Sequence, residues 1–199
     1  TRKAQWKISQ WKNALATPAS ALSGAKDDEE IVAARAYQRY DDTLRAYQAV
    51  DFDDLIVLPI ALLSGHAAAA AKWRARCAYL LVDEYQDTNH AQYMLVKEIV
   101  GPGVAADESS LPPAELAVVG DADQSIYAFR GATIRNILQF EEDYPNAKTI
   151  LLEQNYRSTQ TILNAANAVI GHNSGRVPKR LWTDAGQGAA IVGYVADDE

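Results

Sequence analysis

The two adjacent carboxylates Asp83 and Glu84 are the residues of this sequence best suited to chemistry. They directly follow a short apolar run, residues 78–82, which predicts a buried strand of a parallel sheet. Such a pair suits two tasks, because one carboxylate can hold Mg²⁺ and the next can polarise an attacking water. Acidic pairs also follow strands as helix caps, so the pair by itself leaves both interpretations open.

Two further apolar runs, residues 116–119 and 149–152, end abruptly in polar residues in the same way. Predicted helices at residues 91–100 and 133–143 separate the three runs, so the order is strand, helix, strand, helix, strand. This alternation predicts an α/β fold with a parallel sheet. Ligands of such sheets bind beyond the carboxyl ends of the strands, so we expect the three strand ends to form one site.

Helices are predicted before the sheet. Residues 27–50 begin with four acidic side chains, which suit the positive end of a helix dipole. They continue with a stripe at helical spacing, which we interpret as a packing face against a neighbouring helix and which consists of Ala33, Tyr37, Tyr40, Leu44 and Tyr47. Residues 52–64 predict a second helix, and the alanines at 67–71 predict a weaker third one.

The later part of the chain contains a predicted loop, a further helix and a further strand. Residues 101–113 are rich in Gly and Pro and predict a surface loop. Residues 158–170 predict a helix, and residues 189–195 predict a strand. Because a new strand leads into this last helix, we expect a second domain to begin near Ile150.

The composition is that of a globular chain, with 48% hydrophobic and 23% charged residues. The net charge of -7 and the pI near 5.0 argue against wholesale coating of nucleic acid, so any DNA contact must be local. Positive charge clusters near each end of the chain, and each cluster is either a DNA contact or a solvated surface. The clusters consist of Arg2, Lys3, Lys7 and Lys12 beside Trp6 and Trp11, and of Arg176, Lys179 and Arg180.

Cysteine usage and hydropathy indicate the cellular compartment in which the protein is expected. The one cysteine, Cys77, cannot form an internal disulfide, and no His and Cys residues share metal-ligand spacing. No apolar run approaches the ~20 residues that span a bilayer, and the first residues lack the apolar core of a signal peptide. These features predict a cytoplasmic protein without a membrane segment.

Three longer strings around the strand ends resemble motifs II, III and IV of superfamily 1 DNA helicases. DEYQDT at residues 83–88 resembles motif II, VGDADQSIYAFRGA at residues 119–132 resembles motif III, and LEQNYRST at residues 152–159 resembles motif IV. DFDDLI at residues 51–56 and KRLWT at residues 179–183 are similar to the UvrD/PcrA/Rep branch of this superfamily. The resemblance covers nearly the whole chain and is most diffuse at its start.

The resemblance implies a site for ATP and Mg²⁺. Asp83 would hold Mg²⁺, and Glu84 would orient or deprotonate the attacking water. Gln124 would sense the γ-phosphate and couple it to the DNA, a task that suits a neutral side chain with both a donor and an acceptor. The alternative for Gln124 is a turn residue that bonds its own backbone.

The same resemblance implies two further nucleotide contacts. Arg157 would act as an arginine finger, because its permanent planar charge suits the γ-phosphoryl oxygens in the transition state. A salt bridge to Glu153 or Asp121 is the alternative for Arg157. Tyr156 would stack on the adenine ring, with packing between domains as its alternative.

Tyr127, Phe129 and Arg130 would contact single-stranded DNA according to the resemblance. The two rings lie two residues apart, so in an extended segment both project to one side, where they can stack bases of any sequence. Relatives usually carry Trp at the position of Phe129 and often Arg or Gly at the position of Ala128, so this chain has the smaller ring. The alternative is burial of both rings in the core.

No Gly-rich loop ending in Gly-Lys-Thr or Gly-Lys-Ser occurs in the chain, so the phosphates would lack their usual cradle. We therefore expect an internal piece of a helicase that does not hydrolyse ATP by itself. By the family's organisation, residues 1–50 would be the C-terminal part of the helical 1B subdomain, and residues 51–149 the second half of motor domain 1A. Residues 150–199 would begin motor domain 2A. The expected fold class is α/β, with a RecA-like parallel sheet portion between a helical segment and the start of a second RecA-like domain.

The parent enzyme is expected to be an ATP-dependent 3′-to-5′ DNA helicase of DNA repair or replication restart. Its expected partners are single-stranded DNA, single-strand/duplex junctions and repair proteins. One alternative is a non-catalytic DNA- or protein-binding module that uses basic residues such as Lys7 and Lys12. Another is a relative from the nuclease-linked RecB/AddA branch, which Ala122 and Asp123 disfavour because motif III of that branch reads differently after Gly-Asp.

Overall fold

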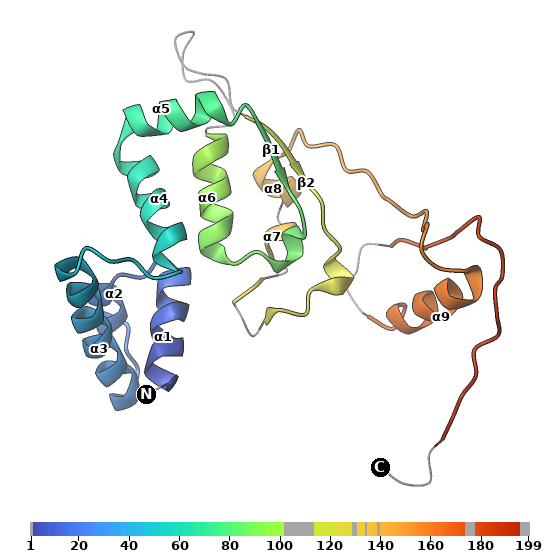
Figure 1. The fold of residues 1–199 in the computed structure, drawn as a ribbon, viewed down its shortest axis with the longest axis horizontal. Helices are drawn as coiled ribbons and strands as arrows, with labels where there is room; N and C mark the ends of the chain where they lie inside the picture. Colours follow the sequence, from blue (N-terminus) through green and yellow to red (C-terminus); the bar gives the residue numbers. More distant parts are fainter. Residues whose placement is uncertain are drawn as a thin grey trace. The chain divides into compact units, whose positions relative to one another are not determined.

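The chain divides into two compact units in the computed structural model, Thr1–Tyr144 and Pro145–Glu199 (Figure 1). The first unit contains the helices α1 to α8 and the sheet, and the second contains α9. The described residues are 2–101, 114–128, 131–133, 135–138, 140–173 and 178–195.

Three helices form the start of the first unit: α1 (Arg2–Asn13), α2 (Pro18–Ser23) and α3 (Asp28–Ala46). Asp27 caps helix α3, because its carboxylate accepts the backbone N–H of Glu30 and satisfies one of the unpaired amides of the first turn. This confirms the predicted helix, although it ends at Ala46 and not near residue 50.

A small apolar core holds these three helices together. It consists of Ile8, Ala21, Ala34 and Tyr37, with Trp11 packed against it. The rings of Trp11 and Tyr37 stack with their centroids 6.2 Å apart. The predicted stripe on α3 is buried only where α1 and α2 cover it, because Tyr37 is buried whereas Tyr40 and Tyr47 are exposed.

Helices α4 (Asp54–Gly65), α5 (Ala67–Arg76) and α6 (His90–Val100) form the next layer, in which α4 contacts both α5 and α6. Helix α6 begins with a capping box, since Asn89 and Gln92 exchange side-chain and backbone hydrogen bonds. Over the described residues, no single helix is long and apolar enough to cross a membrane, and α4 with α5 passes that test only as a pair bent by 113°.

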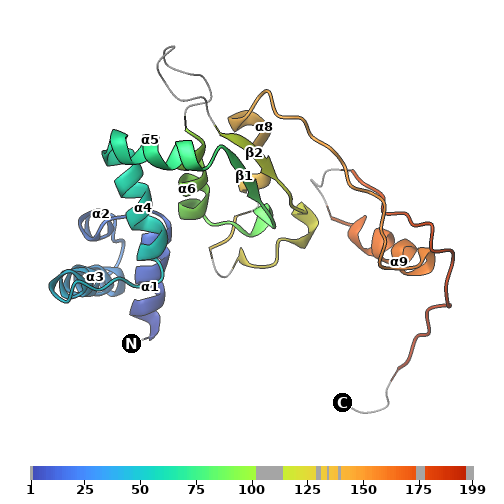
Figure 2. The same cartoon turned by 45° about the horizontal axis from the view of Figure 1, so that its top comes forward.

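The sheet has two parallel strands in the described part of the chain, β1 (Tyr79–Val82) and β2 (Glu115–Val118), with helices on its flanks (Figures 1 and 2). Their register pairs Tyr79 with Glu115 and Val82 with Val118. Both strands were predicted, but the expectation that the first is buried is wrong. Tyr79 and Leu81 are 78% and 71% exposed, because alternate side chains of a strand share one face and no described element covers this one.

Short 3₁₀ and α-helical segments follow the strands. Segment η1 (Tyr85–Asp87) follows β1, and η2 (Ala122–Gln124) follows β2. The helix expected at residues 133–143 is represented by α7 (Arg135–Leu138) and α8 (Phe140–Asp143). Most of the loop expected at residues 101–113 lies outside the described residues, which resume at residue 114.

The second unit has the predicted helix, α9 (Gln160–Ile170), but neither of the predicted strands. Residues 149–152 and 189–195 are irregular, and Ile150, Leu152 and Tyr194 are exposed. An apolar run becomes a strand only when a neighbouring strand takes up its backbone hydrogen bonds. In the described part of this unit, the only such pairing is a single parallel bridge between Gln154 and Trp182. The RecA-like topology and the domain boundaries near residues 50 and 150 stay predictions.

Candidate functional site

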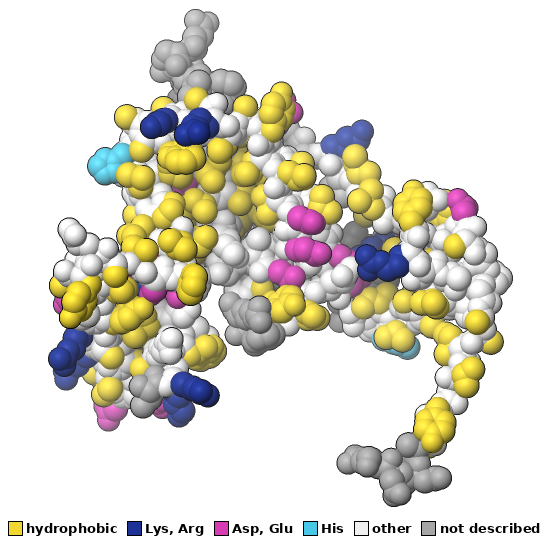
Figure 3. Space-filling model, viewed as in Figure 1, with side chains coloured by type: hydrophobic (Ala, Val, Ile, Leu, Met, Phe, Trp, Pro, Cys, Tyr) yellow, Lys and Arg dark blue, Asp and Glu magenta, His cyan; other side chains and the backbone are white. Residues whose placement is uncertain are grey.

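The carboxylates Asp83 and Glu84 lie where β1 ends, beside the end of β2. The parallel ladder continues past both strands, because Val119 donates its backbone N–H to Val82 O at 2.8 Å and Tyr85 donates to Val119 O at 2.9 Å. Both carboxylates are exposed. Figure 3 shows acidic side chains gathered on the face around these strand ends. The predicted site therefore opens to solvent and is not sealed in apolar packing.

The backbone of Glu84 adopts a left-handed conformation, with φ 49° and ψ 44°. For a residue with a Cβ this conformation costs about 1–3 kcal/mol, and such residues gather at functional sites. Asp83 Oδ1 accepts the Glu84 N–H at 2.9 Å and so supports the turn. The Glu84 side chain makes no capping hydrogen bond to η1, which argues against the helix-cap interpretation of the pair.

Gln86 ties the end of β1 to the end of β2. Its side chain is 1% exposed, and its Nε2 donates to Glu84 Oε2 at 2.7 Å. Its Oε1 accepts the backbone N–H of Asp121 at 3.0 Å. A buried amide with both ends bonded has a single orientation, so Gln86 holds the Glu84 carboxylate in a defined place relative to the second strand end.

Gln124 joins the same edge through Asp121. Its Nε2 donates to Asp121 Oδ2 at 2.8 Å, and its backbone N–H donates to Asp121 O at 2.9 Å. The side chain thus bonds another side chain and not its own backbone, unlike in the turn-residue alternative. Glu84, Gln86, Asp121 and Gln124 consequently form one continuous hydrogen-bonded chain, and the structure brings Asp83, Glu84 and Gln124 to one edge of the sheet.

The segment that resembles motif III folds back onto the segment that resembles motif II. Ala132 forms an antiparallel bridge with Asn89, and Thr133 donates its backbone N–H to Thr88 O at 3.1 Å. Tyr127 is 36% exposed, so it is not a core residue. Phe129 and Arg130, the other two expected DNA contacts, lie outside the described residues.

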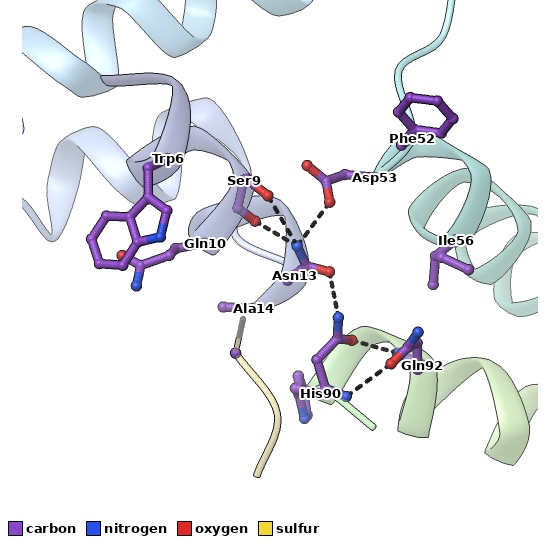
Figure 4. Close-up of a pocket in the computed structure, with 12 residues that line it drawn as sticks. Trp6, Ser9, Gln10, Asn13, Ala14, Phe52, Asp53, Ile56, His90 and Gln92 are labelled. Atoms are coloured by element: carbon purple, nitrogen blue, oxygen red, sulfur yellow. Dashed lines mark hydrogen bonds between the residues drawn. The ribbon is translucent and has the colours of Figure 1, made fainter. Parts of the chain in front are cut away.

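A pocket of about 660 Å³ lies in the first unit between α1, the start of α4 and the start of α6 (Figure 4). Its walls carry two exposed aromatic rings, Phe52 at 90% and Trp6 at 56% exposure. The remaining lining is mainly amide and other polar side chains, with Gly131 from the segment that resembles motif III. Side chains of Gln10 and Gln92 reach its surface from opposite helices.

Asn13 connects the walls of this pocket. Its Nδ2 donates to Asp53 Oδ1 at 2.8 Å and to Ser9 O at 2.9 Å, and its Oδ1 accepts from Asn89 Nδ2 at 2.7 Å (Figure 4). Three elements that are far apart in the sequence therefore meet at one side-chain amide. The polar wall of the pocket is consequently held by bonds of defined direction.

Lys12, the neighbour of Asn13, holds the turn before α4. Its side chain is buried, and Nζ bonds Asp51 Oδ2 and Asp54 Oδ1, each at 2.7 Å. Burial opposes the charge of Lys12, but the two carboxylates outweigh it and raise the pKa of Lys12. The three acidic residues of this turn thus bond α1, whereas Phe52 between them is left facing solvent.

This arrangement corrects one reading of the basic residues near the start of the chain. Lys12 is enclosed by its carboxylates, and Lys7 bonds Glu30 at 2.6 Å. A buried cation that is already paired cannot reach a phosphate without breaking its ion pairs. The binding-module alternative therefore loses Lys12 as a contact, whereas Lys7, whose side chain is 30% exposed in its pair with Glu30, leaves the alternative open at that residue. Of the other cluster, Arg176 lies outside the described residues.

The second unit holds Tyr156 and Arg157 in a turn that Asn155 shapes. Asn155 Oδ1 accepts the backbone N–H groups of Arg157 and Ser158 at 2.9 and 2.7 Å. The Tyr156 ring is exposed, and its hydroxyl donates to Gln154 Oε1 at 2.9 Å. Within the described second unit, Arg157 makes no ion pair with Glu153, whose carboxylate instead accepts the backbone N–H of Arg180.

The sequence patterns did not predict this pocket. Its one signal in the sequence is Phe52, a single ring among three acidic residues in the stretch that resembles the UvrD/PcrA/Rep branch. A ring in such a polar stretch is a poor core residue and a good contact residue. Trp6 stood out only as a neighbour of the basic residues near the start of the chain, which are either a DNA contact or a solvated surface.

Comparisons with known proteins identify the relatives of this chain. Residues 1–145 match the UvrD/REP helicase N-terminal domain. The chain is 59% identical over 195 residues to the ATP-dependent DNA helicase UvrD1 of Mycobacterium tuberculosis, covering 96% of this chain and 25% of that protein. It is 50% identical to the ATP-dependent DNA helicase PcrA of Staphylococcus epidermidis and 45% identical to Rep of Salmonella typhimurium, covering 96% of this chain and 25% and 27% of those proteins.

The chain thus spans about a quarter of the length of these relatives. The matched region includes both strand ends, the buried Gln86 between them and the pocket. On the extent of that match and the identity to its relatives, the chain belongs to the UvrD/REP helicase family.

Proposed function

We propose that this chain is part of an ATP-dependent DNA helicase and supplies the acidic and sensing side of its nucleotide site. The observation that carries the proposal is the hydrogen-bonded chain from Glu84 through Gln86 and Asp121 to Gln124. It places a carboxylate and a neutral amide at one open edge of a parallel sheet, where nucleotides bind in such folds. Membership of the UvrD/REP family supports the same reading.

The residues at this edge fit Mg²⁺. Carboxylate oxygens are the ligands this ion prefers, and Asp83 has an exposed carboxylate of which only Oδ1 bonds the neighbouring backbone. No group of three or more His, Cys, Asp or Glu forms a ready-made metal cage in the described ranges. That suits Mg²⁺, which usually takes one or two carboxylates and completes its shell with water and phosphate oxygens.

The chain's own residues would then divide the work of ATP hydrolysis. Asp83 would hold Mg²⁺, whose charge stabilises the phosphate oxygens when ATP is bound. Glu84 would orient the attacking water and accept its proton, and the bond from Gln86 to one carboxylate oxygen keeps the other in place. Gln124 would contact the γ-phosphate. Arg157 and Tyr156 would serve as arginine finger and adenine contact, as the family resemblance implies.

We propose the pocket beside α1 as part of the surface for single-stranded DNA. Exposed rings such as Phe52 and Trp6 can stack bases of any sequence, and an amide such as Gln10 can bond base edges. Tyr127, with Phe129 and Arg130, would extend this surface, since Gly131 of the same segment lines the pocket. The 3′-to-5′ direction, a role in repair or replication restart, junction substrates, repair-protein partners and a cytoplasmic location are proposed from the resemblance alone.

Fluorescence anisotropy with a labelled oligo(dT) tests the DNA surface. We expect Phe52→Ala to raise the Kd by about 5- to 150-fold, the range for loss of one stacked base. Tyr47→Ala is the matched control, because Tyr47 is also a strongly exposed ring but does not line the pocket, and it is expected to leave the Kd unchanged. Equal affinity for Phe52→Ala and the unaltered chain would contradict the proposal.

Phosphate release tests the claim about the nucleotide site. The chain lacks the Gly-Lys-Thr or Gly-Lys-Ser loop, so we expect no ATP turnover by the pure 199-residue protein, even with Mg²⁺ and single-stranded DNA. A malachite-green assay measures this. Robust Mg²⁺-dependent turnover that Glu84→Gln abolishes would show that the chain is catalytic by itself and would overturn this part of the proposal.

A further inference from the structure

The start of α6 touches both the pocket and the candidate nucleotide site. Asn89 directly follows the segment 83–88 and caps α6, since its Oδ1 accepts the backbone N–H of Gln92 at 2.9 Å. The cap leaves the Nδ2 donor of Asn89 available, and this donor bonds Asn13 Oδ1 across the pocket wall at 2.7 Å. The oxygen of this side chain thus caps the helix, and its nitrogen bonds the pocket wall.

The Asn13 amide has no freedom to turn. Its nitrogen is committed to Ser9 O and Asp53 Oδ1, and its oxygen to Asn89. Rotation of the amide by half a turn would set its oxygen against the Asp53 carboxylate and its nitrogen against the Asn89 donor. A group in the pocket that displaces Asp53 from the Asn13 amide therefore changes the bonds that set the direction of the Asn13 oxygen toward Asn89.

A second set of bonds leads from Asn89 back to the carboxylates. Thr88 is fixed from α7, because Asn136 Nδ2 donates to its carbonyl oxygen at 3.1 Å and to its hydroxyl at 3.0 Å. The hydroxyl of Thr88 in turn donates to Tyr85 O at 2.7 Å. Gln86 continues the path to Glu84. Few backbone or side-chain groups along this path of hydrogen bonds, from Asn13 through Asn89 to Glu84, can therefore move independently.

We propose that the Asn13–Asn89 hydrogen bond transmits occupation of the pocket to the position of Glu84 and Gln86. Asn13 and Asn89 are positioning residues in this inference, which rests on the proposed function in taking single-stranded DNA as the occupant. The route differs from the one through Gln124 as far as Gln86, where the two meet, because it arrives through the start of α6 and not through the end of β2. Coupling of this kind is reciprocal, so binding at either site affects the other.

Nuclear magnetic resonance of the 199-residue chain tests the coupling with a short oligo(dT) as the probe. The indole N–H of Trp6 reports occupation of the pocket, and the side-chain amide of Gln86 reports the strand ends. Asn89→Ser keeps a residue that caps helices well but is too short to reach Asn13. Asn13→Ala breaks the same bond from α1. Gln38→Ala is the control, since it removes an amide that bonds Asp42 on the exposed face of α3.

We expect oligo(dT) to shift both resonances in the unaltered chain and in Gln38→Ala. In Asn89→Ser and Asn13→Ala, the Gln86 shift should be lost at oligo(dT) concentrations that saturate the Trp6 shift. A Gln86 shift that persists in either folded variant overturns the inference, as does a fixed Gln86 resonance in the unaltered chain while Trp6 shifts. A fixed Trp6 resonance defeats the pocket assignment itself and the coupling with it. If one variant does not fold, the other decides, because each breaks the bond from a different side.

Discussion

Gly120 lies against the side chain of Gln86 so closely that a Cβ at residue 120 would stand 2.7 Å from Gln86 Oε1. The same Cβ would stand 2.9 Å from Ile137 Cδ1 and 3.2 Å from Tyr85 N. Real Cβ atoms do not approach other atoms so closely, and the glycine is what allows the Gln86 amide to reach the backbone of Asp121. The hydrogen-bonded edge of the candidate site depends on this contact.

Gly120→Ala is therefore expected to destabilise the chain by about 1–3 kcal/mol, the usual cost of overpacking. Urea unfolding followed by circular dichroism measures this change. Gly65→Ala is the matched control, because nothing lies within 4 Å of a Cβ at residue 65, and its free energy of unfolding is expected to stay within about 1 kcal/mol of the unaltered chain. Similar values for the two variants would refute the steric account.

Lys12→Met is expected to cost about 3–5 kcal/mol, because it leaves the carboxylates of Asp51 and Asp54 without their buried cation. Lys3→Met removes an ion pair of the same kind at the surface, where both side chains are exposed, and is expected to change stability by at most about 1 kcal/mol. Chemical denaturation of the two variants compares them directly. A small effect of Lys12→Met would mean that the turn before α4 tolerates unpaired carboxylates.

The stability of the chain is expected to fall in acid. Burial opposes ionisation of Asp51, but the hydrogen bond from Lys12 and its other bonds outweigh it and lower its pKa. A lowered folded-state pKa contributes stability above the unfolded value of about 3.9, and this contribution is lost as the pH falls through the folded value. The unfolding temperature should thus decline below about pH 4, and this decline should be smaller in Lys12→Met.

An alkaline decline is expected from the same cluster. The pKa of Lys12 is raised, and burial raises the pKa of Tyr37 to about 12. Both raised values contribute stability below the unfolded pKa of about 10, and these contributions are lost as the pH rises through the folded values. Thermal melts between neutral pH and pH about 11 measure this decline in the unfolding temperature. An unfolding temperature that is constant over that range would contradict the assignment.

Two buried tyrosines are expected to respond in opposite ways to loss of the hydroxyl. The Tyr85 hydroxyl is buried without a hydrogen-bond partner among the described residues, so Tyr85→Phe should be neutral or stabilising. The Tyr37 hydroxyl donates to Ala16 O at 3.2 Å, so Tyr37→Phe should destabilise the chain by about 0.5–1.5 kcal/mol. Denaturant midpoints of the two variants provide the test, and a loss for Tyr85→Phe would point to an unseen partner.

The sequence by itself determined the features whose causes are local. Helix α3 begins where Asp27 caps it, and α6 begins where Asn89 and Gln92 form a capping box, because a cap and its first turn lie within a few residues. The apolar runs at residues 78–82 and 116–119 predicted the two strands, and the strings beside them indicated the helicase family that the comparisons support. The helix caps need no distant partner, and the two strands need only each other.

Only the tertiary structure decided which distant residues meet. The run at residues 149–152 has the same apolar pattern as β1 but finds no neighbouring strand in the described chain, and a strand exists only through its pairing. From the sequence, Lys12 was expected at the surface, but in the structure Asp51 and Asp54 enclose it. The sequence likewise did not predict the hydrogen bond between Asn13 and Asn89. Such contacts depend on how helices pack, which local sequence spacing does not specify.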